Sequence, residues 1–478
     1  MTPVVPSDAR SRPPRTQLLT QLFDPGTMQV IRSQVRPATR SSRPTPGDGV
    51  LGAAGTVARR RVFAYAYDEA HHAGSLGVAG AYTILRVLEL AAQAAAPVVA
   101  FVESAGARLQ EGAAALAGYG RVFREVVRLH HRVPQIAVIT GTSAGGAAYA
   151  PALMDWTIFV EDSLMFLTGP AIVREAIGEE VGMAELGGAR VHAKSGVADF
   201  VAEDERHATR LAQSLLSCLP QSAGAAVPSA PAREPANGGD PGAYVPAASR
   251  TVYDMREVIR AVVDASWHLE CSARYARNMY TGLCRIDGRV VGVIASQPRH
   301  RGGVIDVDSA RKATAFIGKC DAYGIPLVVL VDTAGFMPGT LQERAGIIGA
   351  GADLIRAFAE ASVPRVTVVV RKAYGGAYIT MNSKDLGAHF AFAWPDAEIG
   401  VMSARSAALI IEGNRGDPDP VSRERAIEQR AARYAEQHLS ASAAAAQGLV
   451  DEVIDPACTR SRLAWALSML ARENGEHG

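Results

Sequence analysis

Two short glycine turns are the part of this sequence that could carry chemistry. Residues 366–381 read VTVVVRKAYGGAYITM, in which a β-branched run leads through Gly375 and Gly376 into a helical pattern. Such a run is typical of a strand buried on both faces, and glycines let the backbone turn sharply where the strand ends. The first amide N–H groups of the following helix are unpaired and lie at the positive end of its dipole. The pattern therefore predicts a backbone site for an oxyanion.

The same pattern occurs in residues 134–149, where PQIAVITGTSAGGAAY runs from a proline through an apolar strand to Gly145 and Gly146. A second pair of strand-to-glycine turns lies upstream, PVVAFVESAG at 97–106 and PLVVLVDTAG at 326–335. A single Gly-Gly after a strand is more often only a turn, but repetition favours a binding role. We interpret the halves as a diverged duplication with two similar sites.

Strands and helices must position these turns in each half. In the first half, residues 50–67 alternate as a hairpin, and apolar residues at helical spacing predict helices over 79–95 and 114–130. In the second half, Asp287-Gly288 predicts a hairpin turn. A helix is expected over 378–386, directly after the second Gly-Gly.

Length and composition describe an ordinary globular protein. The 478 residues allow two to four domains, and 48% hydrophobic with 20% charged residues provide ample core. A net charge of +1 argues against nucleic acid as a partner. The five cysteines are scattered without CxxC spacing, which fits a reducing compartment. No stretch approaches the ~20 apolar residues of a membrane helix, so we expect a cytoplasmic protein with no membrane insertion.

Composition also divides the chain. The chain begins with a Pro/Ser/Arg-rich segment. An Ala/Pro/Gly/Ser-rich stretch without periodicity separates the two halves. The predicted parts are an N-terminal arm at 1–46, expected to be partly disordered, a first domain at 47–220, a flexible linker at 221–250 and a second domain at 251–478.

Several stretches resemble the carboxyltransferase (β) subunits of biotin-dependent acyl-CoA carboxylases, the propionyl-CoA and acetyl-CoA carboxylase group. They are SAGARLQEG (104–112), TSAGGAAYAPALMDWT (142–157), FLTGP (166–170), ELGGARVHAKSGVAD (185–199), YDMREVIRAVVD (253–264), the run AGFMPGTLQERAGIIGAGADLIRAFAEASVPRVTVVVRKAYGGAYITMNSKDLG (334–387) and AWPDAEIGVMSARSA (393–407). The resemblance implies an α/β fold of two tandem crotonase-like (ClpP/crotonase) ββα-spiral domains from an internal duplication. It also implies a homo-oligomer, a hexamer, whose active site uses the N-half of one subunit and the C-half of another.

The family's mechanism explains why such a site can be mostly backbone. Carboxybiotin gives up CO2 and becomes a ureido enolate, which removes the α-proton of an acyl thioester, and the thioester enolate then attacks CO2. Two oxyanions develop, one on each reactant, so two oxyanion holes match the duplication. A side-chain base is unnecessary because biotin transfers the proton.

By this resemblance the two Gly-Gly turns have different partners. Gly145 and Gly146 serve the acyl thioester, whereas Gly376 and Ala377 hold the ureido carbonyl of biotin. Further candidate donors at the other repeated turns are Gly106, Ala107, Gly335 and Phe336.

Ile379 bears on the acyl group. The family position lies at the floor of the acyl pocket and typically carries Asp in propionyl-type members. Ile there implies other or longer acyl groups, although simple core packing at the start of a helix is the alternative.

The implied partners follow from what is missing. No Met-Lys-Met biotin-attachment tripeptide and no Gly-rich ATP phosphate loop occur in the sequence. Biotin is therefore expected on a separate carrier, carboxylated by a biotin carboxylase/biotin carboxyl carrier subunit, with a coenzyme A thioester as substrate. YDEAHHAG at 67–74 departs from the family pattern, so an acyl carrier protein thioester stays open. The alternatives are a biotin-dependent decarboxylase or transcarboxylase subunit and a non-catalytic scaffold, against which the intact Gly-Gly-Ala in both halves argues.

Other polar residues have plainer interpretations. Ser104, Asp68 and Glu69 are interpreted as surface turn residues rather than acids or bases. Arg371 and Lys372 could bind CoA phosphates or a partner, or merely charge a strand end. The pairs His71-His72 and His130-His131 lack a third ligand at metal spacing and are expected to be solvated, so no metal is predicted.

Overall fold

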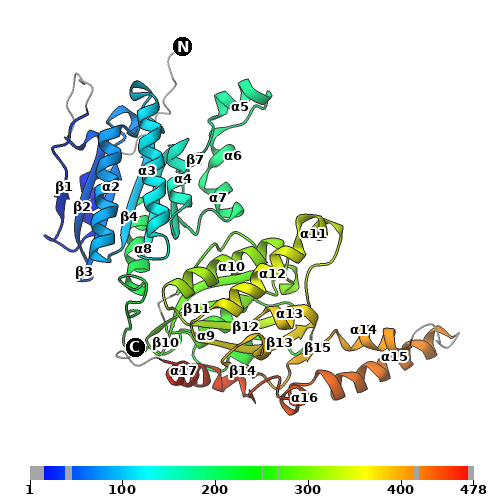
Figure 1. Ribbon diagram of the computed structural model, residues 1–478. Coiled ribbons are helices and arrows are strands. Elements are labelled where there is room, and N and C mark those ends of the chain that lie inside the picture. Colours follow the sequence, from blue (N-terminus) through cyan, green and yellow to red (C-terminus); the bar gives the residue numbers. More distant parts are fainter. Residues whose placement is uncertain (1–14, 38–45, 250, 266–267, 413–418, 472–478) are drawn as a thin grey trace. The chain divides into compact units, whose positions relative to one another are not determined.

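The computed structural model describes residues 15–37, 46–249, 251–265, 268–412 and 419–471. The chain divides between Ala225 and Ala226 into two compact units, here unit 1 and unit 2 (Figure 1). Within the described residues, each unit is built on an eight-stranded sheet. Much of the predicted arm, residues 1–14 and 38–45, lies outside the described residues.

The sheet of unit 1 has the order β1-β2-β3-β4-β5-β6-β8, and β7 pairs with the end of β5. The first three strands pair antiparallel and the rest parallel. The strands are β1 (Gln29–Ile31), β2 (Val50–Val57), β3 (Arg60–Tyr67), β4 (Val98–Ser104), β5 (Gln135–Ala144), β6 (Trp156–Val160), β7 (Leu164–Phe166) and β8 (Phe200–Ala202).

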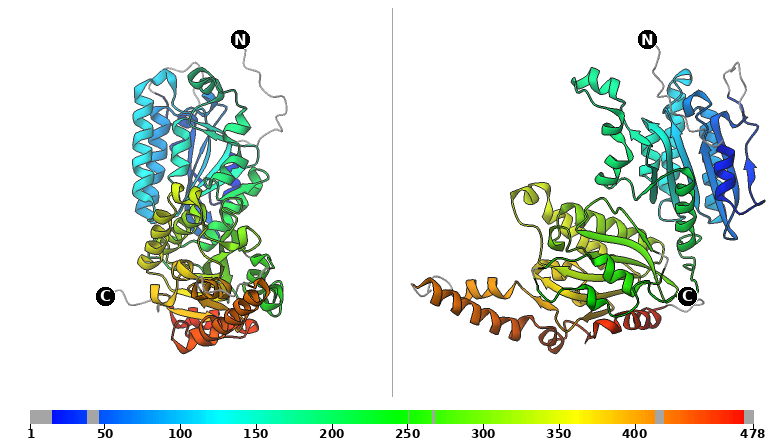
Figure 2. Two further views of the ribbon diagram at one scale, coloured as in Figure 1. Left: turned by 90° about the vertical axis from the view of Figure 1, so that its right-hand side faces the viewer. Right: turned by 180° about the vertical axis from the view of Figure 1, so that it is seen from behind.

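Helices cover both faces of this sheet. The long helices α2 (Val78–Ala94) and α3 (Ala113–Leu129) lie side by side over one face, each within one residue of its predicted position (Figure 1). The helices α1 (Arg15–Leu22) and α8 (Glu205–Cys218) lie on the other (Figure 2). The remaining helices are α4 (Gly146–Ala152), α5 (Pro170–Ile177), α6 (Met183–Gly187) and α7 (Ala189–Ser195).

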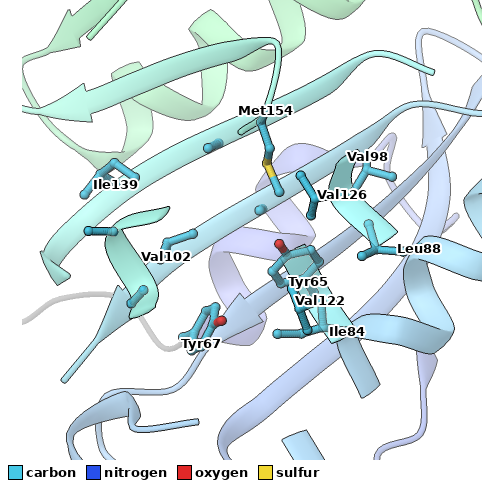
Figure 3. Packing of buried hydrophobic residues seen from close by; sticks show 14 of the residues in the cluster. Tyr65, Tyr67, Ile84, Leu88, Val98, Val102, Val122, Val126, Ile139 and Met154 are labelled. Atoms are coloured by element: carbon cyan, nitrogen blue, oxygen red, sulfur yellow. The ribbon is translucent and has the colours of Figure 1, made fainter. Parts of the chain in front are cut away.

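The core beneath α2 and α3 explains why these segments are helical. Figure 3 shows Ile84 and Leu88 of α2 and Val122 of α3 packed with Tyr65 and Val98 from the sheet. All five are buried. Because apolar residues three to four apart share one face of a helix, their burial against the sheet selects the helical period.

Unit 2 repeats this plan. Its sheet has the order β16-β14-β13-β12-β11-β10-β9, with β15 paired to the end of β13. The strands are β9 (His268–Glu270), β10 (Met279–Ile286), β11 (Arg289–Ser296), β12 (Leu327–Thr333), β13 (Arg365–Tyr374), β14 (Phe390–Ala393), β15 (Glu398–Gly400) and β16 (Glu452–Val453). Thus β12 and β13 occupy the places of β4 and β5, and the predicted duplication is confirmed.

The helices of unit 2 also lie on two faces of the sheet. One side carries α10 (Val307–Ala322) and α12 (Ile347–Glu360), and the other carries α9 (Met255–Val262) and α17 (Thr459–Met469) in a second core. The others are α11 (Thr340–Ala345), α13 (Gly375–Thr380), α14 (Ala404–Glu412), α15 (Pro420–Tyr434) and α16 (Ala441–Ala446).

Two segments differ from expectation. The helix expected over 378–386 ends at Thr380, because Asn382 adopts a left-handed backbone with φ 59°. Residues 226–249, most of the flexible linker expected over 221–250, belong to unit 2 and are hydrogen-bonded to the rest of it. Ala230 N–H donates to the Gly288 carbonyl at 3.0 Å, and Ala265 N–H donates to the Glu234 carbonyl at 3.0 Å. Backbone hydrogen bonds of this kind leave no periodicity in the sequence. In the described part of the chain, no helix is long and apolar enough to cross a membrane.

Candidate active site

The two predicted turns of unit 1 lie beside each other at the carboxyl ends of adjacent parallel strands. The β4–β5 register ends with Ser104 opposite Ser143. A Cβ atom added to Gly106 would lie 3.0 Å from the Ala144 carbonyl oxygen. Gly106 and Gly145 have φ of 97° and 59°, a left-handed backbone that glycine adopts without a Cβ penalty. The two glycine turns predicted separately in unit 1, at Gly106 and at Gly145, therefore form one site in the structure.

Unit 2 has the same arrangement. The β12–β13 register ends with Thr333 opposite Ala373, after a shift that has its counterpart between β4 and β5. Gly335 and Gly375 again have positive φ, 138° and 57°. A Cβ atom added to Gly376 would lie 3.7 Å from the Phe336 ring, in ordinary contact, with nothing else within 4 Å. Gly376 is exposed, so this turn is accessible.

Backbone bonds aim one amide of each upstream turn. In unit 1, Leu76 N–H donates to the Gly106 carbonyl at 2.8 Å and Arg108 N–H donates to the Leu76 carbonyl at 3.0 Å. Ala107 lies between these bonds in a parallel bridge, so its own N–H points to the opposite side.

Phe336 is held in the same way in unit 2. Ile305 N–H donates to the Gly335 carbonyl at 3.0 Å, and Met337 N–H donates to the Ile305 carbonyl at 2.7 Å. Of the four further candidate donors, Ala107 and Phe336 thus have N–H groups that point away from the bridging segment. The two glycines instead shape the turns.

A hydroxyl group holds each glycine amide. Gly106 N–H donates to Ser104 Oγ at 3.2 Å, and Gly335 N–H donates to Thr333 Oγ1 at 3.3 Å. Ser104 is fully buried, so the expectation of a surface residue was wrong. Its Oγ lies 3.4 Å from the hydroxyl of Tyr119, whose ring would lie 3.1 Å from a Cβ atom on Gly146. Tyr119 therefore supports both turns of unit 1, and sequence reasoning missed it.

The four residues predicted to be catalytic are not equivalent. Gly145 N–H donates to the Phe166 carbonyl at 3.1 Å and is committed to the sheet. Gly146 begins α4, where first-turn amides have no intrahelical acceptor. Gly376 is exposed and Ala377 is buried at the start of α13. The amides of Gly146, Gly376 and Ala377 thus lie in the first turn of a helix, where they have no intrahelical acceptor.

Ile379 lies on α13 with 48% of its surface exposed. Such exposure disfavours the alternative that Ile379 is only core packing.

A buried carboxylate precedes each hydroxyl. In unit 2, Asp332 accepts from Arg371 Nε at 3.0 Å, and both side chains are buried. Burial raises the pKa of Asp332, and the charge of Arg371 opposes that rise. Arg371 also donates to the Thr251 carbonyl at 2.9 Å. Arg371 is therefore engaged within unit 2, which argues against its binding CoA phosphates or a partner and against its merely charging a strand end.

In unit 1 the corresponding acid is Glu103, which pairs with Arg15 of α1. Arg15 is also ion-paired with Glu69 at 2.6 Å and with Glu205 at 3.0 Å. A Cβ atom on Gly141 would lie 2.1 Å from the Glu103 carboxyl group, so that position must lack a side chain. Arg15, 88 residues from Glu103, carried no sequence signal for this contact.

The histidine pairs also differ from expectation. His71 is buried, with Nε2 3.4 Å from Asp48 Oδ1, and burial together with the nearby Arg108 lowers the pKa of His71. The pair His130-His131 does have a third possible ligand, Asp155. That acid lies 24 residues further along the chain and no short spacing could reveal it.

Comparison with known proteins identifies the family of this chain. The family model for the carboxyl transferase domain matches residues 16–477. The chain is 42% identical to the propionyl-CoA carboxylase beta chain of Roseobacter denitrificans, covering 90% of this chain and 84% of that protein. It is 41% identical to the methylmalonyl-CoA decarboxylase subunit alpha of Veillonella parvula, covering 95% and 90%.

Among solved structures, the transcarboxylase 12S hexamer with hydrolysed methylmalonyl-coenzyme A bound superposes with a TM-score of 0.91. That structure is 39% identical, and the match covers 97% of this chain and 92% of that chain. The predicted fold class of two tandem crotonase-like domains is thereby confirmed. The chain belongs to the carboxyl transferase domain family and is a carboxyltransferase.

Proposed function

We propose that this protein moves CO2 from carboxybiotin, held by a separate carrier protein, to the α-carbon of an acyl-CoA. The observation that carries the proposal is the repeated pair of turns, each with a directed amide beside a helix start and a hydroxyl holding the turn. Two backbone sites suit a reaction in which negative charge develops on two different oxygens. The similarity to a propionyl-CoA carboxylase beta chain supports biotin and coenzyme A as the groups involved.

The two units would divide the work. In unit 1, the amides of Ala107 and Gly146 face the thioester oxygen, while in unit 2 those of Phe336, Gly376 and Ala377 face the ureido oxygen of biotin. Carboxybiotin supplies CO2 and the base for the α-proton when bound. Each donor contributes on the order of 2.7–4 kcal/mol of transition-state stabilisation in a dry site. Gly376 is exposed, with only the Phe336 ring within 4 Å of a Cβ atom placed there, so a ligand can approach this turn.

Each unit holds one turn pair, so a complete site needs both kinds. We propose a homo-oligomer, a hexamer, in the cytoplasm, working with a biotin carboxylase/biotin carboxyl carrier subunit. The hexameric assembly of the transcarboxylase 12S relative supports the proposed hexamer. Exposed apolar residues on α5 and on α14 offer surface for assembly; they include Ile172, Ile177, Leu409 and Ile410. Light scattering that found a fully active monomer would contradict the proposal.

The assignment of halves is tested with two valine variants. Gly376→Val fills the space above the turn of unit 2, and should abolish carboxyl transfer while acyl-CoA binding changes less than about twofold. Gly146→Val should abolish acyl-CoA binding and its transfer. The control is Gly120→Val, an exposed helical glycine of α3 with nothing within 4 Å of a Cβ atom.

Calorimetry with acyl-CoA and transfer assays with carboxylated biotin read out the two functions separately. Because the Gly146 position is 3.1 Å from Tyr119, circular dichroism must show that this variant remains folded. Equal loss of acyl-CoA binding in both folded variants would refute the division of work.

A decarboxylase or transcarboxylase subunit is the second candidate, favoured by the similarity to the methylmalonyl-CoA decarboxylase subunit. The backbone sites would serve the reaction in either direction. Supplying a carboxyacyl-CoA with free biotin, and separately an acyl-CoA with carboxylated biotin, gives the preferred direction from the ratio of the two rates. Inactivity in both directions, with coenzyme A thioesters and with acyl carrier protein thioesters, would instead favour a non-catalytic scaffold.

A further inference from the structure

We propose that His130, His131 and Asp155 of unit 1 bind a divalent first-row transition metal ion of the Zn²⁺ type. His130 is the C-cap residue of α3, His131 follows it, and Asp155 directly precedes β6. The three ligand atoms lie within 4.8 Å of one another. This inference is independent of the proposed function, because the residues lie at the amino end of β5 and the glycine turn lies at its carboxyl end.

The carboxylate is fixed before any ion binds. Asp155 is buried, and its Oδ2 accepts the Gln135 N–H at 2.8 Å. Its Oδ1 lies 3.0 Å from His130 Nδ1 and 3.9 Å from His131 Nε2. The Asp155 Oδ1 atom thus has one nitrogen of each imidazole within 3.9 Å.

These spacings suit a common ion. Zinc–nitrogen and zinc–oxygen bonds are about 2.0–2.2 Å, so two ligands of one ion lie roughly 3 to 4 Å apart. Imidazole and carboxylate are ligands for zinc and its neighbours in the first transition row. The imidazole side chains of His130 and His131 are 42% and 36% exposed, so an ion can enter from solvent and keep water as further ligands.

The end of α3 also favours a cation here. The backbone carbonyls at the end of α3, a helix of 17 residues, carry the negative end of its dipole. The two rings are stacked with centroids 3.8 Å apart, in a turn where His131 has φ 58°.

The site would have a structural role. β5 has ten residues, or roughly 30 Å at about 3.3 Å per residue, which separates the ion from the glycine turn. An ion would join the end of α3 to the start of β6, and so tie together two parts of unit 1. Ion binding should raise the thermal unfolding midpoint and leave the turnover number unchanged.

The test uses untagged, full-length protein freed of metal with a chelator and then titrated with ZnCl2 by calorimetry and with CoCl2 by visible absorption. We expect one equivalent per chain and ligand-field bands with Co²⁺. His131→Asn should weaken Zn²⁺ binding by more than about 10-fold, because loss of a ligand costs at least as much as the roughly 10- to 100-fold that follows loss of a residue supporting one. Asn tolerates the left-handed backbone at this position.

The matched control is His72→Asn, which also replaces an exposed histidine of positive φ next to a second histidine. It should bind Zn²⁺ like the parent. Binding weaker than about 1 mM in the parent, or equal Zn²⁺ affinity in the parent and in His131→Asn, would overturn the proposal.

Discussion

Replacing Arg371 by Met would test whether the buried ion pair of unit 2 supports its turn. The substitution keeps an unbranched apolar stem but leaves Asp332 buried without its partner at 3.0 Å. It also removes the donor to the Thr251 carbonyl and a guanidinium that lies 4.9 Å from the centre of the Tyr253 ring. Breaking a buried pair from one side costs about 3–5 kcal/mol in free energy of unfolding.

The loss should depend on pH in a defined direction. The pKa of Asp332 is raised in the folded protein by burial and held down by Arg371, so Arg371→Met should raise it further. A carboxyl group whose pKa is higher folded than unfolded destabilises the fold when ionised, and this penalty disappears as pH falls through the folded pKa. The variant should therefore be closer to the parent at pH 5 than at pH 8.

Urea unfolding measures this at one fixed protein concentration, because assembly contributes to apparent stability. Hydrogen exchange of β12 and β13 locates the change in unit 2. Arg356→Met is the control, since its ion pair with Asp353 also spans 3.0 Å but both side chains are exposed, and exposed pairs contribute about 0–1 kcal/mol. The additional change Asp332→Asn should recover part of the loss. A loss below about 1 kcal/mol for Arg371→Met, or no recovery in the double variant, would refute the reasoning.

Three further changes test unit 1 and the acyl site. Tyr119→Phe removes the hydroxyl that lies 3.4 Å from Ser104 Oγ. Because a hydrogen bond contributes about 1 kcal/mol, kcat/KM for the acyl-CoA should fall about fivefold. An unchanged kcat/KM would show that Tyr119 does not position the turn. Arg15→Met leaves the Glu103 cluster without its cation, so unit 1 should unfold at a lower urea concentration, as expected when a buried ion pair is broken from one side. An unchanged unfolding midpoint would contradict this. For Ile379→Asp, specificity constants for acetyl, propionyl, butyryl and longer thioesters should shift toward shorter chains, by up to about fourfold per methylene at ~0.8 kcal/mol each; an unchanged order in an active variant means that Ile379 does not set chain length.

Much of the fold could be predicted because its signals are local. The β-branched run of β13 and the helical spacing of α2 and α3 are written in consecutive residues, and burial on one or two faces enforces them. The glycine turns were visible for the same reason, since a positive φ needs glycine at a particular place in the chain.

The supports of the site could not be predicted, because they are contacts between distant residues. Nothing near Glu103 indicates that Arg15 will reach it, and nothing near His130 indicates Asp155. The commitment of the Gly145 amide to the Phe166 carbonyl likewise depends on how β7 pairs with β5. Such pairings are set by the folded sheet and leave no mark on residue spacing.

The two halves also preserve a record of descent. Glu103 and Asp332 occupy the same position in the two repeats. The partner of Asp332 is Arg371 in β13, at the position that Gly141 occupies in β5. The partner of Glu103 is Arg15, which lies outside the repeated strands. The simplest history is an acid that predates the duplication, followed by separate recruitment of a counter-ion in each copy. A relative with both acids but only one of the two arginines would represent the intermediate, whereas relatives in which the arginines are present and the acids vary would reverse that order.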